Sequence, residues 1–232
     1  MKNFGLHYLQ LHPQKYPEQI VHLNFIIIPQ LHILLLIKLL YFILLIFLLF
    51  INKKAENSFQ QVIINTIQNN SKKKVKQKEK IYRSLDDGLT FQAIQNVIIG
   101  QENLLWFFKS SNNNGTVFGG FTPYQWQIAC YSGNEIENPS FLFSETLKEI
   151  YPIIQSKGNW TQWFEKQYII FGGTANYDQD LRINTDFKSG YSRLGIGYQA
   201  PVGVDTSKYS THLFGALEPN VIECEIYKII FE

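Results

Sequence analysis

His212 is the only histidine in the last two-thirds of the chain, and Glu218, Glu223 and Glu225 follow it closely. An imidazole beside carboxylates is a combination that performs general acid–base catalysis. A hydrolytic or redox enzyme would therefore be centred on His212, Glu223 and Glu225. Nothing in the spacing makes these residues neighbours, and a single histidine in a polar region is more often structural. The sequence therefore favours a non-catalytic protein, and the enzyme is the alternative hypothesis.

Other chemistry has less support in the sequence. The pairs Gly119-Gly120 and Gly172-Gly173 lack the lysine and hydroxyl residue of a phosphate-binding loop. Cys130 and Cys224 have neither the spacing of a zinc site nor a partner set for a disulfide framework. We therefore expect no catalytic residue, cofactor, metal or nucleic-acid ligand. The net charge of +2 over 232 residues also carries no strong overall field.

The elements that would position these residues alternate short strands with little helix. An apolar stripe at helical spacing predicts a helix over 90–99, and Asn114-Gly115 predicts a hairpin between strands at 104–109 and 116–121. Further strands are expected at 140–144, 167–171, 181–183 and 221–231. This pattern predicts an α+β domain, an antiparallel β-sandwich with short flanking helices.

The last expected strand separates its side chains by alternation. Ile222, Cys224, Ile226 and Ile230 fall on one side, and Glu223, Glu225 and Tyr227 fall on the other. Cys224 is then a small buried side chain rather than a reactive thiol. The two glutamates are expected to face solvent, where they protect a sheet edge or contact a basic partner. On the second interpretation, reversing both charges weakens partner binding and leaves stability nearly unchanged.

A set of glycine and aromatic residues recurs along the domain, as expected for tight turns and close backbone approach in a β-rich core. Its members are Asp87, Gly88, Phe118, Gly119, Gly120, Trp126, Phe141, Phe143, Phe171, Gly172, Gly173, Asp180, Leu181 and Gly215. In this order and spacing they resemble the motifs of the TLDc domain family, over about Lys80 to Phe231. The chain departs from the family pattern where Thr174 to Gln179 lengthen a loop, and where Cys224 replaces an aliphatic residue.

The resemblance implies a fold and a function. The fold is the family's sandwich with flanking helices. The family includes the oxidation-resistance proteins, which regulate the vacuolar proton-pumping ATPase. The chain is thus expected to bind the cytosolic sector of that ATPase and to contribute to oxidative-stress resistance. A purely structural membrane tether is a further alternative.

Leu31 to Ile51 is an apolar run that is long enough to cross a bilayer core of about 30 Å as a helix. Its single charge is Lys38, whose insertion cost of about 2.5 to 3.5 kcal/mol is outweighed by more than a dozen Leu, Ile and Phe residues. The sequence predicts an uncleaved transmembrane helix. A signal peptide is disfavoured because no small residues form a cleavage site after Ile51. A wrongly translated non-coding stretch remains an alternative for residues 1–80.

Lysines concentrate after this run, at Lys53, Lys54 and six positions from Lys72 to Lys80. The positive-inside rule therefore places 1–30 outside the cytosol and everything after Ile51 in the cytosol. Residues 52–79 are expected to be a lysine-rich linker, either a solvated tether or a segment attracted to an anionic leaflet. Within it, Phe59, Ile63 and Ile67 at four-residue spacing allow a short amphipathic helix as well as an irregular stretch. The domain is expected to be 80–232 and to fold without residues 1–79.

Overall fold

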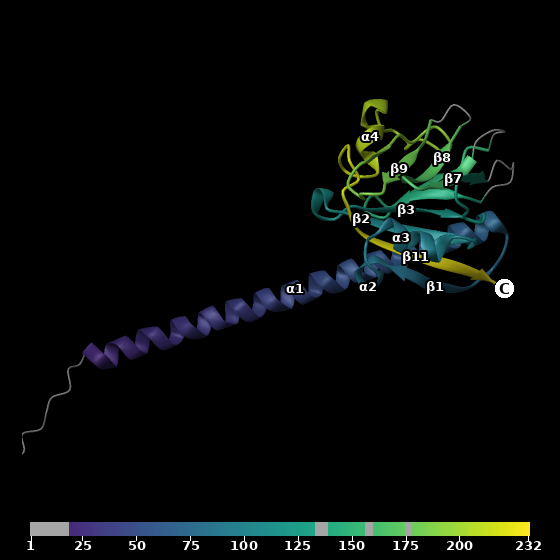
Figure 1. The fold of residues 1–232 in the computed structure, drawn as a ribbon. Helices are drawn as coiled ribbons and strands as arrows, with labels where there is room; N and C mark the ends of the chain where they lie inside the picture. The colour runs from purple at the N-terminus through teal and green to yellow at the C-terminus, as the bar shows by residue number, and fades with distance from the viewer. Residues whose placement is uncertain (1–18, 133–138, 156–159, 175–177) are drawn as a thin grey trace, which may run out of the picture. The chain divides into compact units, whose positions relative to one another are not determined.

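The computed structural model describes residues 19–132, 139–155, 160–174 and 178–232 (Figure 1). The chain divides into two compact units, Met1–Lys54 and Ala55–Glu232. Helix α1 (Gln19–Ser71) begins in the first unit and ends in the second. The greater part of the expected extracytosolic segment, residues 1–18, lies outside the described residues.

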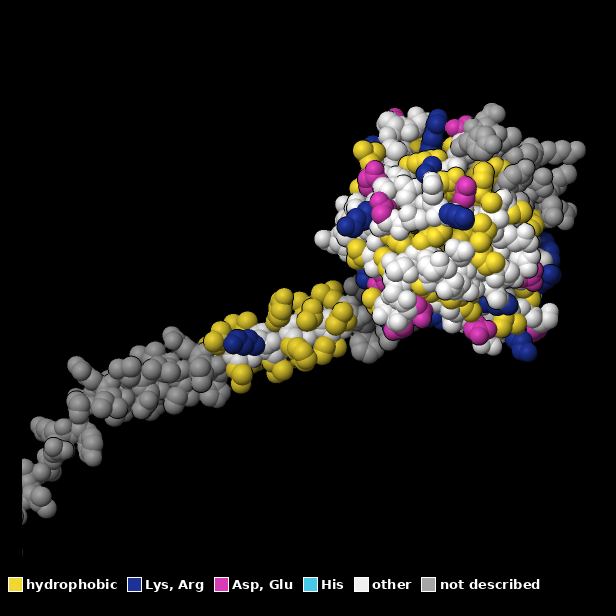
Figure 2. Space-filling model, in the orientation of Figure 1, with side chains coloured by type: hydrophobic (Ala, Val, Ile, Leu, Met, Phe, Trp, Pro, Cys, Tyr) yellow, Lys and Arg dark blue, Asp and Glu magenta, His cyan; other side chains and the backbone are white. Residues whose placement is uncertain are grey.

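The apolar run from Leu31 to Ile51 is helical and belongs to α1. The side chains described within it are those of residues 33–49, and all of them are exposed (Figure 2). In the portion of the chain with described side chains, no helix reaches the length and apolarity required to cross a membrane. The predicted transmembrane helix is therefore not supported by the structure.

The second unit contains two antiparallel sheets. The first has six strands in the order β1-β11-β2-β3-β5-β6, and every neighbouring pair is antiparallel. These strands are β1 (Val75–Arg83), β2 (Leu104–Ser110), β3 (Val117–Thr122), β5 (Phe141–Ser144), β6 (Glu149–Pro152) and β11 (Val221–Phe231). The first and last strands of the sequence thus pair with each other at one edge.

The second sheet has five strands in the order β10-β9-β8-β7-β4. These are β4 (Cys130–Ser132), β7 (Trp160–Glu165), β8 (Tyr168–Gly173), β9 (Leu181–Asn184) and β10 (Gly190–Ser192). Short helices complete the unit: α2 (Ser84–Asp87), α3 (Phe91–Ile98), α4 (Tyr209–His212), and the 3₁₀ turns η1 (Asn112–Asn114) and η2 (Thr206–Lys208). The predicted α+β class with antiparallel sheets is confirmed.

Several local predictions are also confirmed. Thr90 caps α3, because its side chain accepts a hydrogen bond from the backbone N–H of Ala93 at 3.2 Å. Strands β2 and β3 form the predicted hairpin around Asn114 and Gly115, with Leu104 opposite Thr122 and Lys109 opposite Val117. Strands β1, β4, β6, β7 and β10 are not among those expected from the sequence.

Strand β2 explains why the first sheet is buried on both faces. Its first five residues, LLWFF, are all apolar, so both sides of the pleat must be covered there. Leu104, Trp106 and Phe108 join a core that includes residues of the second sheet, such as Phe171 and Leu181. Leu105 and Phe107 join another core on the opposite face. The sheet therefore lies between two separate apolar layers.

The C-terminal part of α1 covers that opposite face. Phe59, Ile63 and Ile67 are 4 %, 0 % and 0 % exposed and pack with Leu105, Phe107 and further residues of the sheet. Their four-residue spacing places them on one helix face. The amphipathic-helix alternative for this stretch is the one that the structure contains.

The expectation that 52–79 is a linker is therefore corrected. Three side chains of this range are core residues, and β1 begins at Val75. The expected domain start at Lys80 falls within β1, whereas the compact unit begins at Ala55. The physical reason is that a bare sheet face rich in Phe and Leu needs a cover, and α1 supplies it.

Candidate functional site

Several glycines of the motif set lie where neighbouring backbone or side-chain atoms leave no room for a Cβ. A Cβ at Gly119 on β3 would lie 1.8 Å from the carbonyl oxygen of Trp106 on the neighbouring strand. A Cβ at Gly172 on β8 would lie 2.2 Å from Oδ2 of Asp180, and Gly172 also has a φ of +70°. The aromatic members of the set, such as Trp126, Phe141 and Phe171, are at most 1 % exposed. These residues occupy the interior.

Asp180 organises the loop that follows β10. Its Oδ1 accepts a hydrogen bond from the backbone N–H of Ile196 at 3.0 Å, and its Oδ2 accepts one from Gly197 at 2.7 Å. Burial raises the pKa of Asp180 to about 7, although these backbone hydrogen bonds oppose the shift. The Asp180 side chain is completely buried, and its Oδ2 leaves no room for a Cβ at Gly172. Asp180 therefore holds the loop in place through these two hydrogen bonds. Its buried carboxyl group has no exposed surface with which to contact a substrate.

Three other motif residues lie in turns nearer the surface: Asp87 and Gly88 at the end of α2, and Gly215 after α4. Gly88 ends α2 with a φ of +82°, and its carbonyl oxygen accepts a hydrogen bond from Tyr82 Oη at 2.6 Å. Asp87 Oδ2 accepts the backbone N–H of Arg83 at 2.9 Å. Gly215 has a φ of +71° and contacts Asn113.

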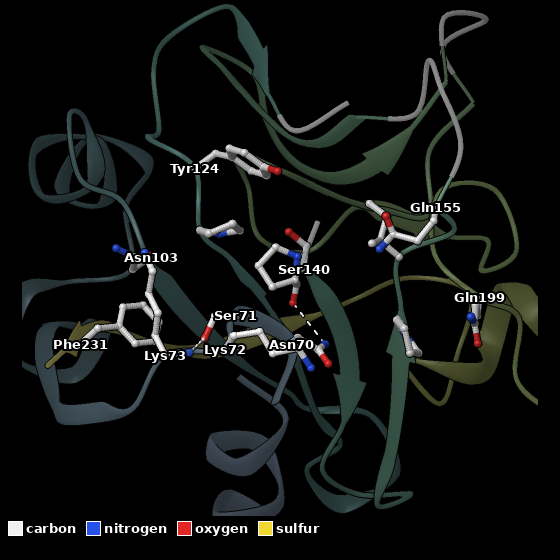
Figure 3. A pocket seen from close by; sticks show the side chains of 14 residues that line it. Asn70, Ser71, Lys72, Lys73, Asn103, Tyr124, Ser140, Gln155, Gln199 and Phe231 are labelled. Atoms are coloured by element: carbon white, nitrogen blue, oxygen red, sulfur yellow. Dashed lines mark hydrogen bonds between the residues drawn. The ribbon is translucent and has the colours of Figure 1, made fainter. Parts of the chain in front are cut away.

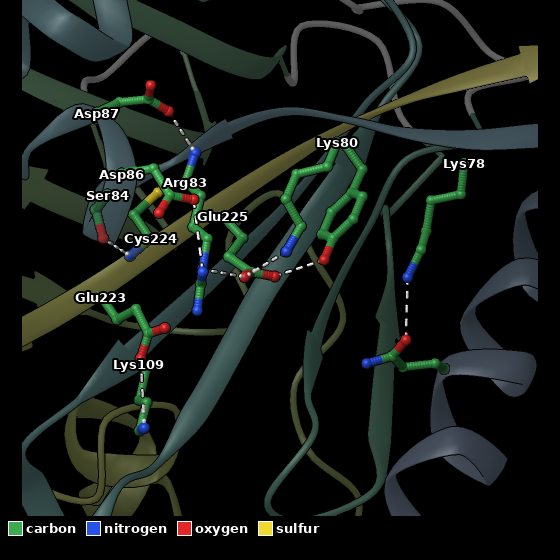
Figure 4. Close-up of polar contacts among 12 residues, drawn as sticks. Lys78, Lys80, Arg83, Ser84, Asp86, Asp87, Lys109, Glu223, Cys224 and Glu225 are labelled. Carbon is green, nitrogen blue, oxygen red and sulfur yellow. Dashed lines mark hydrogen bonds and ion pairs between the residues drawn. The ribbon is translucent and has the colours of Figure 1, made fainter.

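Glu223 and Glu225 lie on β11, between β1 and β2 (Figure 4). Glu225 Oε1 is 2.7 Å from Nζ of Lys80 and 3.4 Å from Nε of Arg83. Tyr227 donates a hydrogen bond of 2.5 Å to its other oxygen. Glu223 Oε2 is 3.4 Å from Nζ of Lys109 on β2. Each glutamate is thus ion-paired with a basic side chain of a neighbouring strand, Glu225 with β1 and Glu223 with β2.

These contacts set the charge state of the network. Burial disfavours the charged form of Glu225, but hydrogen bonds from Lys80 and Tyr227 outweigh burial and lower its pKa. Burial, followed by the hydrogen bond to Glu225, raises the pKa of Tyr227 to about 12. Burial also disfavours the charged form of Lys80, but its contacts with Glu225 and Tyr227 outweigh burial and raise its pKa. Lys80 and Glu225 are therefore both charged at neutral pH.

The expectation that both glutamates face solvent is corrected. Their side chains are only 22 % and 24 % exposed, whereas those of Lys80, Arg83 and Lys109 are 40 %, 39 % and 47 % exposed. The basic side chains lie over the carboxylates, because β11 is an interior strand flanked by β1 and β2. Ile222 was expected on the buried side but is 51 % exposed, since the β11–β2 register shifts between Val221 and Glu223. Cys224 is buried as expected.

The rival catalytic centre of His212, Glu223 and Glu225 does not form. His212, at the end of α4, instead contacts β6: its Nε2 is 2.9 Å from Glu149 Oε2 and 2.9 Å from Tyr151 Oη. Tyr151 also donates a 2.6 Å hydrogen bond to Glu149. Burial and the bond to Glu149 raise the pKa of Tyr151, and this phenol is only 2 % exposed.

This second cluster joins α4 to the edge strand of the first sheet. Burial disfavours the charged form of Glu149, yet the hydrogen bonds from Tyr151 and His212 lower its pKa. All three polar groups are engaged with one another, so the arrangement connects two elements. The part of the chain with described side chains contains no group of His, Cys, Asp or Glu residues with the geometry of a metal site.

Sequence reasoning did not find the partners of the two glutamates. The sequence places Lys80 at the expected start of the domain and Lys109 at the end of a hairpin strand, and it pairs neither with a glutamate. The contact between Lys80 and Glu225 spans 145 residues of sequence. The one available signal was the run of alternating lysines at Lys76, Lys78 and Lys80, which is typical of an edge strand.

Comparison with known proteins extends this description. No curated protein matches the sequence significantly. A family model, the TLDc domain, matches residues 51–230. The match covers both sheets and the part of α1 that packs on the first sheet, which agrees with a folded unit from Ala55 rather than from Lys80. The chain therefore belongs to the TLDc domain family.

Proposed function

We propose that the protein is a non-catalytic interaction domain that faces the cytosol and regulates the vacuolar proton-pumping ATPase, with an effect on oxidative-stress resistance. The observation that carries the proposal is the family match, which extends over nearly the whole second unit. A role of this kind in the oxidative-stress response and ATPase regulation is the one that the family suggests. The arrangement of His212 with Glu149 and Tyr151 gives no specific support to the rival enzyme.

The charged surface of β1, β11 and β2 is the proposed contact. It presents Lys80, Arg83 and Lys109 to solvent, with the carboxylates of Glu223 and Glu225 beneath them. Lys76 is an exposed lysine of the same edge strand, four residues before Lys80. Asp86, which is 65 % exposed and 3.5 Å from Arg83, is the acidic exception on this surface. Because the other accessible charges are cationic, we infer an acidic partner surface on the ATPase rather than the basic one expected from the glutamates alone.

The sign of the partner's charge gives a sharp test. With an acidic partner, Lys76→Glu weakens capture of the cytosolic ATPase sector, and Glu223→Lys strengthens it. With a basic partner, both effects reverse. Binding is measured by co-purification of ATPase subunits and by its dependence on salt, since screening weakens contacts between exposed charges.

Lys166→Glu is the matched control, because Lys166 is an exposed lysine between β7 and β8 of the other sheet. It makes the same charge change away from the proposed surface. Equal binding by all three variants and the unmodified protein would reject this surface. Failure of the unmodified protein to capture any ATPase subunit would reject the proposed function.

We further propose that Leu31–Ile51 attaches the domain to a membrane. The support is the sequence and the exposure of every described apolar side chain from Ile33 to Leu49, each at least 40 %. Such a continuous apolar surface is rarely left in water. Recovery of the protein in the membrane pellet after alkaline carbonate extraction, and its release by deletion of 31–51, are the expected results. Recovery of the full chain in the supernatant would contradict membrane insertion.

A further inference from the structure

A cavity of about 620 Å³ lies in the second unit, away from the Glu223–Glu225 network (Figure 3). Its walls come from the end of α1, the turn after β3, the start of β5, the end of β6 and the end of β11. A volume of this size lies within the range of small-molecule sites, roughly 300 to 1,000 Å³. The cavity is large enough for more than a single inorganic ion.

The charge of the lining is positive. Lys72 and Lys73 line the cavity, and no Asp or Glu is among the described residues that do. Neither lysine forms an ion pair with any residue that the structure describes, whereas the next lysine, Lys74, is 2.8 Å from Glu232. The ammonium group of Lys73 lies 5.6 Å from the ring centre of Phe231 at the cavity wall. Two positive charges are thus available to a bound anion.

The position of these lysines is fixed by the local backbone. Lys72 has a φ of +57°, which ends α1, and the backbone N–H of Lys73 donates to Ser71 Oγ at 3.3 Å. Asn70 Nδ2 donates to the carbonyl oxygen of Pro139 at 3.4 Å, which ties the helix end to the start of β5. The two lysines are therefore carried by an anchored turn and not by a free tail.

The uncharged part of the lining is made of amides and aromatic rings. Asn103, Gln155 and Gln199 supply carboxamides, which both donate and accept hydrogen bonds. Tyr124 and Phe231 supply ring faces. Carboxamides beside aromatic rings suit a molecule that has hydroxyl groups on a compact carbon frame.

We propose that this cavity binds a phosphorylated polyol, as a free small molecule or as the headgroup of a lipid. A phosphate monoester carries a charge of about −1.5 to −2 near pH 7, which matches two lysines better than a single carboxylate does. The polyol occupies the amide-lined part of the cavity, and its phosphate lies between Lys72 and Lys73. This inference does not depend on the proposed ATPase regulation.

The test measures binding of inositol monophosphate to the purified full chain in a neutral detergent, with uncharged inositol as the ligand control. The double variant Lys72→Gln, Lys73→Gln is expected to lose affinity at least about tenfold, because it removes both charge-assisted contacts. The matched control is Lys74→Gln, Lys76→Gln, which makes the same charge change on neighbouring lysines outside the cavity. It is expected to retain binding.

A third variant tests the cavity itself. Asn103→Asp keeps the side-chain size, and Asp tolerates the φ of +57° at this position. It introduces a negative charge into the lining and is expected to weaken inositol monophosphate binding as well. Equal losses in both lysine double variants would indicate general surface attraction and overturn the proposal, and so would unaltered binding by Asn103→Asp.

A second arm separates the two sources of the ligand. Vesicles of phosphatidylcholine are compared with and without phosphatidylinositol monophosphate, and the readout is the difference between them for each variant. A difference that Lys72→Gln, Lys73→Gln abolishes supports a lipid headgroup, whereas binding of inositol monophosphate alone supports a soluble molecule. Absence of both kinds of binding would overturn the proposal.

Discussion

Replacing Ile63 by alanine tests whether the end of α1 belongs to the folded domain. Ile63 is 0 % exposed and packs against the face of the first sheet that the second sheet does not cover. An Ile→Ala change in such a site removes buried apolar surface and leaves a cavity, at a cost of about 2 to 5 kcal/mol. A linker residue would cost less than about 0.5 kcal/mol. The core and linker interpretations therefore predict losses of folding stability that differ several-fold.

The magnitude can be converted into a measurable shift. A domain of this size loses about 2 kcal/mol of stability per molar urea, so the midpoint of Ile63→Ala should fall by about 1 to 2.5 M. Unfolding of the chain Ala55–Glu232 in urea is followed by tryptophan fluorescence, because all four tryptophans lie in this unit. An unchanged slope of the transition would show that the native state keeps its compactness.

Val62→Ala is the matched control. Val62 precedes Ile63 in the same helix but is 44 % exposed, so the same type of truncation should shift the midpoint by less than about 0.3 M. Equal small shifts for both variants would refute the packing of α1 on the sheet. Equal large shifts would show that helix formation itself, rather than burial of one face, is what stabilises the unit.

Three further results are expected. A chain that begins at Lys80 should fail to give a cooperative urea transition, whereas Ala55–Glu232 should give one. The reason is that the shorter chain lacks the apolar cover from α1 and half of β1. Cooperative folding from Lys80 would support a domain that starts at Lys80. Glu225→Gln should lower stability by about 1 to 3 kcal/mol near pH 7. Because the folded-state pKa of Glu225 is lowered, its contribution to stability is present above the ordinary carboxyl pKa and is lost as the pH falls through the lowered pKa. The difference in stability between Glu225→Gln and the unmodified protein should therefore close in acid. A difference that persists in acid would mean that the ion pairs are not its cause. Finally, a cytosolic domain should remain unglycosylated at the sequons of Asn69, Asn114 and Asn159. Of these, Asn159 lies outside the described residues. A change in the protein's gel mobility after glycosidase treatment of native membranes would contradict the predicted orientation.

Local pattern was sufficient for much of the second unit. The run from Leu104 to Phe108, the turn at Asn114-Gly115 and the helical stripe from Phe91 to Ile98 each carry their signal within about ten residues. The motif glycines identified the family because the close approach of neighbouring strands excludes a Cβ at positions such as Gly119. Such constraints are written into residue type and spacing, so one sequence reveals them.

The site required the tertiary structure. Strand β1 contains lysines at Lys76, Lys78 and Lys80 and only one fully buried side chain, Tyr82, so it has no apolar alternation to mark it. It becomes a strand because β11 offers an edge, and that pairing places Lys80 and Arg83 over Glu225.

The sequence by itself determined the fold class, the family and the burial of Cys224. Tertiary structure alone decided the extent of the domain and which charges are accessible. Whether the stretch from Phe59 to Ile67 is a linker or a core helix depends on an apolar sheet face that lies more than 30 residues away in sequence. Whether Glu225 faces solvent depends on a strand 145 residues away. Contacts over such separations arise only when the chain is folded, and local periodicity does not encode them.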